Sequence, residues 1–228
     1  MGTEKMNRCM IIAGGPIGDY GRICSKIRFR AQDYIICVDG GISHAAGLGV
    51  SPDLMVGDMD SAARIPAGVK TLRYQSEKDE TDTILAIQYA LKEGYRDITI
   101  VGGLRGRLDH TMANMEALLY LTRNGGSGRI VDSDNEVCLL MEGKMTFSKR
   151  ENTYFSVFPL FESAEGVTEK GFKYALDRAT LKSSFPLGVS NEFKEDQAEI
   201  SVERGPLLII LSEEIHEKNK TPYNVNGK

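Results

Sequence analysis

Hydrophobic residues in the first 140 positions follow two patterns that alternate along the chain. Short apolar runs bounded by glycine or polar residues predict strands. Between them, apolar residues recur every three or four positions and predict helices over residues 81–93 and 110–123, which end at Gly94 and Gly125. The predicted strands are 9–13, 34–38, 54–56, 71–74, 98–101 and 129–131.

The two halves of the chain differ in this pattern. Alternating strands and helices indicate βαβ units, so residues 1–143 are predicted to form an α/β domain with a mostly parallel sheet. Beyond residue 143 the helical periodicity ends, and short apolar runs predict a small C-terminal all-β sandwich or barrel over 144–212. Residues 213–228 are a polar tail. The C-terminal runs are 145–147, 154–158, 172–175, 198–202 and 207–211.

Charge and composition narrow the functional classes. The formal net charge of −4 argues against a nucleic-acid partner, which usually needs a basic surface. No apolar run approaches the roughly 18 residues of a membrane span, and the apolar stretch near the N-terminus is too short for a signal peptide. The four cysteines form no CxxC pair. We therefore expect a cytoplasmic protein with no nucleic-acid or membrane partner.

Polar, glycine-rich segments follow the predicted strands of the first half. In an open α/β sheet, ligands bind outside the carboxyl ends of the strands, so these segments are expected to meet at one site. Gly14 and Gly15 follow the first strand and allow a nucleotide or phosphate to approach the backbone, although the segment matches neither a P-loop nor GxGxxG. The other segments are 39–41, 57–61, 78–82 and 102–110.

Asp58 and Asp60 are two residues apart after the third strand. In an extended segment this spacing points both carboxylates to one side, where they repel unless a cation lies between them. Mg²⁺ is usually held by one or two carboxylates together with substrate phosphates. A polar turn, in which Gly57 supplies a special backbone conformation, is the alternative explanation.

Other acids in these segments have a structural explanation as well. Asp82 lies in the first turn of a predicted helix, where an acid complements the helix dipole, and either Asp79 or Thr81 suits the cap. Asp109 similarly suits the start of the second helix.

Three basic residues lie in the same segments: Lys78, Arg105 and Arg107. They either remain solvated or neutralise a polyphosphate. Taken together, acids, glycines and basic residues at one sheet edge predict a Mg²⁺-dependent site for a nucleotide or another polyphosphate. Such a site needs no enzyme nucleophile, because positioning and charge neutralisation carry phosphoryl-type transfer.

In order and spacing, these motifs resemble those of the thiamine pyrophosphokinase family. The resemblance continues in the second half, where Gly171-Phe172-Lys173-Tyr174 is similar to the family's GLKY or GLKW segment. Residues 188–192 resemble its G-x-SNE segment, and residues 205–208 resemble its closing strand. The resemblance spans residues 9 to 211, with Met59 where Phe is common and Tyr174 where some members have Trp.

The resemblance implies an activity and an assembly. The expected reaction transfers pyrophosphate from ATP to the hydroxyethyl group of thiamine and yields thiamine diphosphate and AMP. The expected fold is an α/β nucleotide-binding domain followed by a β-sandwich. The expected assembly is a homodimer, in which thiamine lies between the first domain of one subunit and the second domain of its partner.

The resemblance also implies roles for individual residues. Binding of Mg²⁺ and the polyphosphate is assigned to Asp58, Asp60 and Asp82. Asp109, together with Arg107, completes the catalytic edge. Binding of ATP is assigned to Gly14, Gly15, Asp39, Gly40, Gly41, Lys78, Thr81 and Arg105. Binding of the thiamine pyrimidine is assigned to Tyr174, by stacking, and to Ser190 and Asn191. Without the resemblance, a core or interface position is the preferred explanation for Tyr174.

Three other functions compete with this one. A pterin diphosphokinase has a similar nucleotide domain, but segments 171–174 and 188–192 favour thiamine as the acceptor. A nucleotide or thiamine sensor without turnover would not need the full set of acids. A polysaccharide- or protein-binding sandwich is disfavoured because the chain has no tryptophan.

Overall fold

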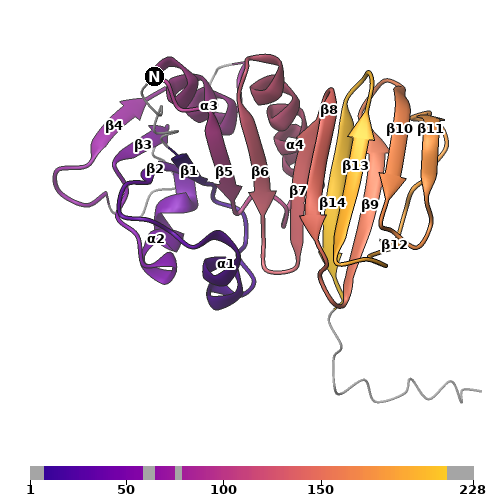
Figure 1. The fold of residues 1–228 in the computed structure, drawn as a ribbon. Coiled ribbons are helices and arrows are strands. Elements are labelled where there is room, and N and C mark those ends of the chain that lie inside the picture. The colour runs from indigo at the N-terminus through magenta and orange to yellow at the C-terminus, as the bar shows by residue number, and fades with distance from the viewer. Residues whose placement is uncertain (1–7, 59–64, 75–78, 215–228) are drawn as a thin grey trace, which may run out of the picture.

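The computed structural model describes residues 8–58, 65–74 and 79–214 (Figure 1). In the first half, strands alternate with helices, as the periodicity predicted. The elements are β1 (Arg8–Ile12), α1 (Tyr20–Ile27), β2 (Tyr34–Val38), the 3₁₀ turn η1 (Asp39–Gly41), α2 (Ile42–Leu48), β3 (Leu54–Gly57), β4 (Lys70–Arg73), α3 (Asp82–Lys92), β5 (Asp97–Val101), α4 (Leu108–Arg123) and β6 (Ser127–Val131).

The second half of the described chain consists of strands joined by turns. The strands are β7 (Asn135–Leu140), β8 (Gly143–Ser148), β9 (Thr153–Pro159), β10 (Ala164–Lys170), β11 (Leu176–Leu181), β12 (Asn191–Glu192), β13 (Gln197–Val202) and β14 (Leu207–Glu213). No helix in the described part of the chain is long and apolar enough to cross a membrane.

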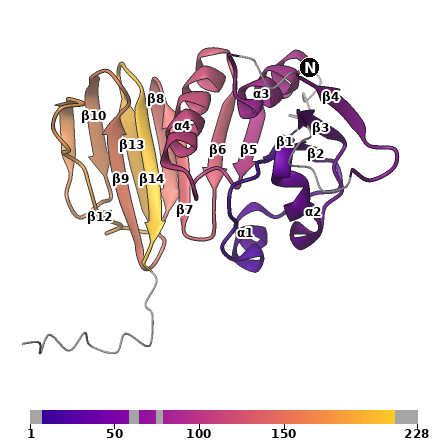
Figure 2. The ribbon, with the colours of Figure 1, turned by 180° about the vertical axis from the view of Figure 1, so that it is seen from behind.

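One ten-stranded sheet runs through the whole molecule, in the order β12-β9-β14-β7-β6-β5-β1-β2-β3-β4. Its β6-to-β4 portion is parallel, as predicted, whereas β7, β14, β9 and β12 are antiparallel to their neighbours. A second sheet, β11-β10-β13-β8, packs on the antiparallel end (Figures 1 and 2). The C-terminal half is thus layered, but one of its layers continues the N-terminal sheet.

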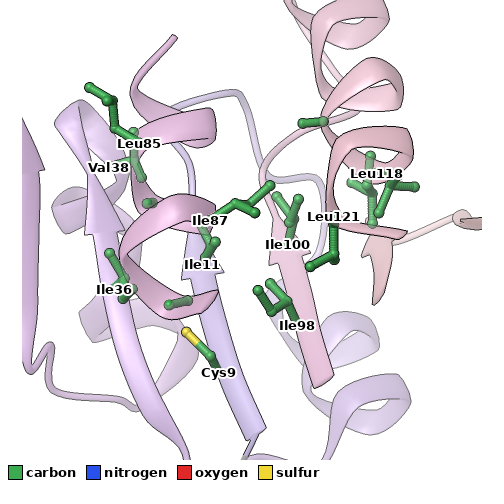
Figure 3. Packing of buried hydrophobic residues seen from close by; sticks show 14 of the residues in the cluster. Cys9, Ile11, Ile36, Val38, Leu85, Ile87, Ile98, Ile100, Leu118 and Leu121 are labelled. Carbon is green, nitrogen blue, oxygen red and sulfur yellow. The ribbon is translucent and has the colours of Figure 1, made fainter. Parts of the chain in front are cut away.

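Helices cover both faces of the parallel portion. Successive side chains of β1 point to opposite faces, so Cys9 and Ile11 pack with α3 and α4 while Met10 and Ile12 pack with α1 and α2. Figure 3 shows the first of these clusters, in which Ile87 and Leu118 meet the sheet. Burial on both faces explains why these strands are continuous apolar runs rather than alternating ones.

Some sequence predictions were wrong or incomplete. The helices α1 and α2 were not predicted, because each is short and buries only two side chains fully. The strands β7, β10 and β11 were also missed. Residues 172–175 were predicted as a strand, but only Phe172 forms a bridge, with Phe193. The backbone of Tyr174 instead bonds to the side chain of Asn191.

Candidate functional site

A cavity of about 540 Å³ lies where the loops after β1, β2 and β5 meet the start of α3 and α4. This is the carboxyl edge of the parallel strands, the place that the fold rule predicted. Eight of the predicted site residues line the cavity: Gly14, Gly15, Asp39, Gly40, Thr81, Asp82, Arg105 and Arg107.

The loops around the cavity are packed backbone against backbone. A Cβ atom added to Gly41 would lie 2.0 Å from the carbonyl oxygen of Ile12, and one added to Gly14 would lie 3.3 Å from the Cα atom of Gly40. Any side chain at Gly41 would push the β2 loop away from β1. The glycines therefore fix the shape of the cavity wall.

Asp39 and Asp58 lie in adjoining turns. Asp39 has a positive φ of 45°, and Gly57, which precedes Asp58, has φ of 144°. A Cβ atom on Gly57 would lie 1.9 Å from the Asp39 Oδ1 atom, so the Asp39 carboxylate rests directly on the turn that leads to Asp58. Asp39 lines the cavity, whereas Asp58 does not; the structure places Asp58 directly after the turn that the Asp39 carboxylate contacts.

Thr81 and Asp82 start α3 at the cavity. The Thr81 hydroxyl accepts the backbone N–H of Ile84 at 3.3 Å and caps the helix, so the structural explanation for Thr81 holds. Asp82 is the first helical residue, and both residues line the cavity. A structural role and a role in ligand binding therefore coexist at this helix start.

Arg105 reaches the cavity from the loop after β5 and is held by the turn between β6 and β7. Its guanidinium forms an ion pair with Asp132 at 3.2 Å and another with Asp134, and it donates to the Ser133 hydroxyl at 3.0 Å. Asp134 also pairs with Arg22 of α1 at 2.9 Å. The positive charge of Arg105 is therefore partly neutralised, and its direction is fixed.

Arg107 and Asp109 pair with each other at 2.5 Å at the start of α4, where both side chains are largely exposed. The hydrogen bond from Arg107 holds the pKa of the Asp109 carboxyl below its usual value. Asp109 accordingly stays ionised and is a weak proton acceptor. Arg107 lines the cavity, whereas Asp109 does not.

Two predicted residues, Asp60 and Lys78, lie outside the described residues. The proposed metal set of Asp58, Asp60 and Asp82 is therefore described only in part. Within residues 8–58, 65–74 and 79–214, no group of three or more His, Cys, Asp or Glu side chains is arranged to hold a metal ion.

The predicted thiamine residues lie together at the other end of the ten-stranded sheet (Figure 1). The ring of Tyr174 is 61% exposed, and the Lys173 ammonium lies 5.5 Å from its centroid. Ser190 has φ of 58°, and its backbone N–H donates to the Ser156 hydroxyl at 3.0 Å. The core position that Tyr174 also suited is wrong, because 61% of the residue is exposed, whereas an interface position is compatible with this exposure.

Asn191 is buried beside Tyr174, with only 3% of its surface exposed. Its Nδ2 atom donates to the Tyr174 carbonyl oxygen at 2.6 Å, and its Oδ1 atom accepts the Tyr174 N–H at 3.0 Å. In this chain the Asn191 side chain therefore holds Tyr174 rather than reaching into solvent.

Reasoning from the sequence missed several residues of both regions. Asp132 and Ser133 directly follow a strand, so the strand-end rule that located the other loops would have found them. Asn114 donates to the Gly103 carbonyl oxygen at 2.9 Å and fixes the loop after β5. Glu169, which bonds to Asn191 at 2.7 Å, gave no signal because it lies inside an unrecognised strand.

Two family models match the chain. "Thiamin pyrophosphokinase, catalytic domain" matches residues 26–127, and "Thiamin pyrophosphokinase, vitamin B1 binding domain" matches residues 144–207. The thiamine pyrophosphokinase of Bacillus subtilis is 32% identical over 216 residues, which cover 91% of this chain and 99% of that protein.

Solved structures agree with these matches. The chain is similar to a crystal structure of the Bacillus subtilis enzyme, with a TM-score of 0.82 and 27% identity over 92% of this chain and all of that one. Thiamin pyrophosphokinase from Geobacillus thermodenitrificans gives a TM-score of 0.78 at 26% identity, with 92% and 99% of the two chains covered. The yeast enzyme gives a TM-score of 0.75 at 14% identity, with 92% of this chain and 87% of the yeast chain covered. At that identity the similarity supports the fold only.

Proposed function

The chain belongs to the thiamin pyrophosphokinase family, and from that membership we propose which of its residues carry the reaction. The activity is the transfer of a pyrophosphoryl group from ATP to thiamine, which gives thiamine diphosphate and AMP. The observation that carries the proposal is the cavity at the strand ends, because it gathers loops from both ends of the matched catalytic segment.

We assign ATP to this cavity. The close-packed backbone of Gly14, Gly15 and Gly40 offers N–H groups without side chains in the way of the phosphates. Arg107 lines the cavity, and the N–H groups that it does not donate to Asp109 remain for a phosphate. Arg105, held by Asp132 and Asp134, offers a guanidinium of fixed direction.

The carboxylates around Gly57 and at the start of α3 suit Mg²⁺. The ligands in this proposal are Asp58, Asp60 and Asp82, with Asp39 against the same turn, and hard oxygen donors that leave room for phosphates are what this ion prefers. A bound Mg²⁺ supplies charge neutralisation for the polyphosphate.

In the proposed reaction, the thiamine hydroxyl oxygen attacks the β-phosphorus of ATP in line. The bond from that phosphorus to the oxygen bridging to the α-phosphate breaks, and AMP leaves with the electron pair. Asp82 is the better candidate to receive the hydroxyl proton, because it lines the cavity, whereas Asp109 is engaged with Arg107. Asp109 instead holds Arg107 at the catalytic edge.

We further propose that thiamine is bound by residues 144–212, with the Tyr174 ring stacked on its pyrimidine and Ser190 beside it. Residues 1–143 then form the ATP domain, whereas Glu213, predicted to open the polar tail 213–228, is the last residue of β14 and pairs with Arg22 at 2.6 Å. The use of ATP by this enzyme supports a cytoplasmic location for the protein.

A homodimer is part of the same proposal. In the sheet order, six strand-to-strand steps separate β12 from β1, which is roughly 29 Å at about 4.8 Å per step. Tyr174 is bonded to Asn191 of β12, so it lies far from the loop after β1 of its own chain. A second copy would bring its own Tyr174 to the cavity.

Product analysis tests the reaction. The protein is incubated with ATP, Mg²⁺ and thiamine, with a parallel sample that lacks thiamine, and the products are identified by mass spectrometry. Thiamine diphosphate with an equal amount of AMP is expected. ADP with thiamine monophosphate would mean that a different bond breaks, and no thiamine-dependent AMP would reject thiamine as the acceptor.

Mixing two defective variants tests the shared site. Asp58→Asn is expected to abolish turnover, and Tyr174→Ala to weaken thiamine binding. In a mixed dimer, one of the two sites has both native residues, so co-expression should restore turnover with the wild-type KM for thiamine. If the mixture shows only the Tyr174→Ala kinetics, each site is built from one chain.

A further inference from the structure

Glu169 is a buried carboxyl group that the proposed reaction does not use. It lies on β10, and only 1% of its surface is exposed. Its Oε2 atom accepts a hydrogen bond from Asn191 Nδ2 at 2.7 Å, while its Oε1 atom has no hydrogen-bond partner among the described residues. Burial raises the pKa of this carboxyl to about 7. A leucine would fill such a position without an unpaired polar atom. The free-energy cost of burying this carboxyl group therefore calls for a structural explanation.

The hydrogen bonds of Asn191 supply that reason. Both of its amide hydrogens are used, one by Glu169 and one by the carbonyl oxygen of Tyr174 at 2.6 Å. Its Oδ1 atom accepts the N–H of Tyr174 and the N–H of Glu192, each at 3.0 Å. An amide turned by 180° would place its oxygen against a Glu169 oxygen and its NH2 group against two backbone N–H groups, so Glu169 reinforces the orientation in which Asn191 holds Tyr174.

The position of the Tyr174 ring depends on the hydrogen bonds between Asn191 and the Tyr174 backbone. Tyr174 is 61% exposed, and the Lys173 ammonium, which pairs with Glu192 at 2.6 Å, lies 5.5 Å from the centroid of its ring. Packing therefore does not hold the ring in place. Its direction is set by the backbone, whose N–H and C=O are both bonded to Asn191.

We infer that Glu169 is a positioning residue of the thiamine site, which orients Asn191 and thereby fixes Tyr174 for its stacking contact with the substrate. This inference rests on the proposed role of Tyr174. Selectivity for the flat pyrimidine ring then depends partly on a residue that never touches it, because a fixed Tyr174 ring loses less entropy on stacking than a mobile one.

The test combines kinetics with a readout that needs no substrate. Glu169→Leu removes the acceptor, Glu169→Gln keeps it, and Glu165→Leu is the matched control on the same strand, where Glu165 pairs with Arg204 at the surface. The measurements are the KM values for thiamine and for ATP, kcat, and the exchange rate of the Tyr174 amide hydrogen by NMR in the substrate-free protein.

Glu169→Leu should raise the KM for thiamine about tenfold, leave the KM for ATP and kcat within about twofold, and speed exchange of the Tyr174 amide about tenfold or more. Glu169→Gln should restore all of these, and Glu165→Leu should leave them unchanged. If Glu169→Leu does not fold, Glu169→Asp, which withdraws the acceptor by one methylene, should show the same pattern.

Two results would overturn the inference. One is a Glu169→Leu or Glu169→Asp protein with unchanged Tyr174 exchange and unchanged KM for thiamine. The other is an equal rise in both KM values, which indicates general loosening of the fold. Tyr174→Ala separates the two proposals: an unchanged KM for thiamine in that variant rejects the stacking role, whereas faster exchange in Glu169→Leu would still show that Glu169 holds the Tyr174 backbone.

Discussion

At the carboxyl ends of β1, β2 and β5, the cavity is shaped by backbone segments in direct contact, and its charged side chains are partly exposed. At the other end of the same sheet, Tyr174 is held by the buried side chains of Asn191 and Glu169. A polyphosphate is recognised by N–H groups and charge, for which rigid turns suffice. A flat heterocycle needs one ring in one place, and in the proposed function the pair of Asn191 and Glu169 provides it. We refer to the end of the sheet with the cavity as the ATP end and to the end with Tyr174 as the thiamine end, after the ligands proposed for them.

The largest effect should come from removing an acid at the ATP end. Asp58→Asn is expected to lower kcat about a thousandfold, since it weakens the site that neutralises the polyphosphate. The melting temperature should stay within a few degrees, which calorimetry checks. Asp53→Asn, at the amino end of the same strand, is the control. An unfolded Asp58→Asn protein whose folded fraction has normal specific activity would reject the metal role.

The rigidity of the ATP end rests on Gly57. Gly57→Ala combines a φ of 144° with a Cβ position 1.9 Å from the Asp39 carboxylate, so it should lower the free energy of unfolding by about 3 kcal/mol and displace Asp39. Gly68→Ala has φ of 88° but open space around the new atom, and should lower it by only about 1 kcal/mol. Equal losses in urea denaturation would show that contact with Asp39 does not matter.

At the thiamine end, the contribution of Glu169 to the free energy of unfolding depends on pH. The folded-state pKa is about 7 and the reference value is 4.5, so between these pH values the folded protein keeps a proton that the unfolded chain releases. Glu169 therefore makes the wild-type protein less stable as pH rises through this window, and the loss is complete above pH 7.

Glu169→Gln removes that dependence. The free energy of unfolding of the variant relative to the wild type should rise by about 2–3 kcal/mol between pH 4.5 and pH 8. Urea denaturation at a series of pH values measures the difference. The control Glu165→Gln should give a nearly flat difference, and a flat difference for Glu169→Gln would contradict the raised pKa.

The smallest effect concerns the ring itself. Tyr174→Ala should raise the KM for thiamine about tenfold, because loss of one aromatic stacking contact costs up to about 1.5 kcal/mol and tenfold corresponds to about 1.4 kcal/mol, and should leave the KM for ATP within about twofold. Tyr174→Phe keeps the ring and should stay near the wild type. A comparable rise in both KM values would remove the distinction between the two ends.

The two ends also differ in how well the sequence predicts them. The strand-end rule located the cavity, because turns after buried strands are marked by glycine and acid residues such as Gly14 and Asp39. Parallel strands were found because burial on both faces makes them apolar throughout. The helices α1 and α2 were not found because each is short and buries only two side chains, and the shared sheet was not found because it depends on pairing between distant segments.

At the thiamine end, the local pattern of apolar and polar residues was not enough to predict the site residues. Glu169 places a charge in a buried strand, which hides the alternation of that strand, and its partner Asn191 is 22 residues away. Segments 171–174 and 188–192 were recognised only through the family resemblance. Their contacts with each other required the structure.

Equilibrium binding tests most directly whether the two ends bind different substrates. Thiamine and an ATP analogue with a methylene group between the α- and β-phosphates are titrated, with Mg²⁺, into Asp58→Asn and Tyr174→Ala by calorimetry. Asp58→Asn should weaken binding of the analogue about tenfold or more and leave thiamine binding near the wild type, and Tyr174→Ala should do the reverse. Equal weakening of both ligands by either variant would contradict the division of the site between the two ends of the sheet.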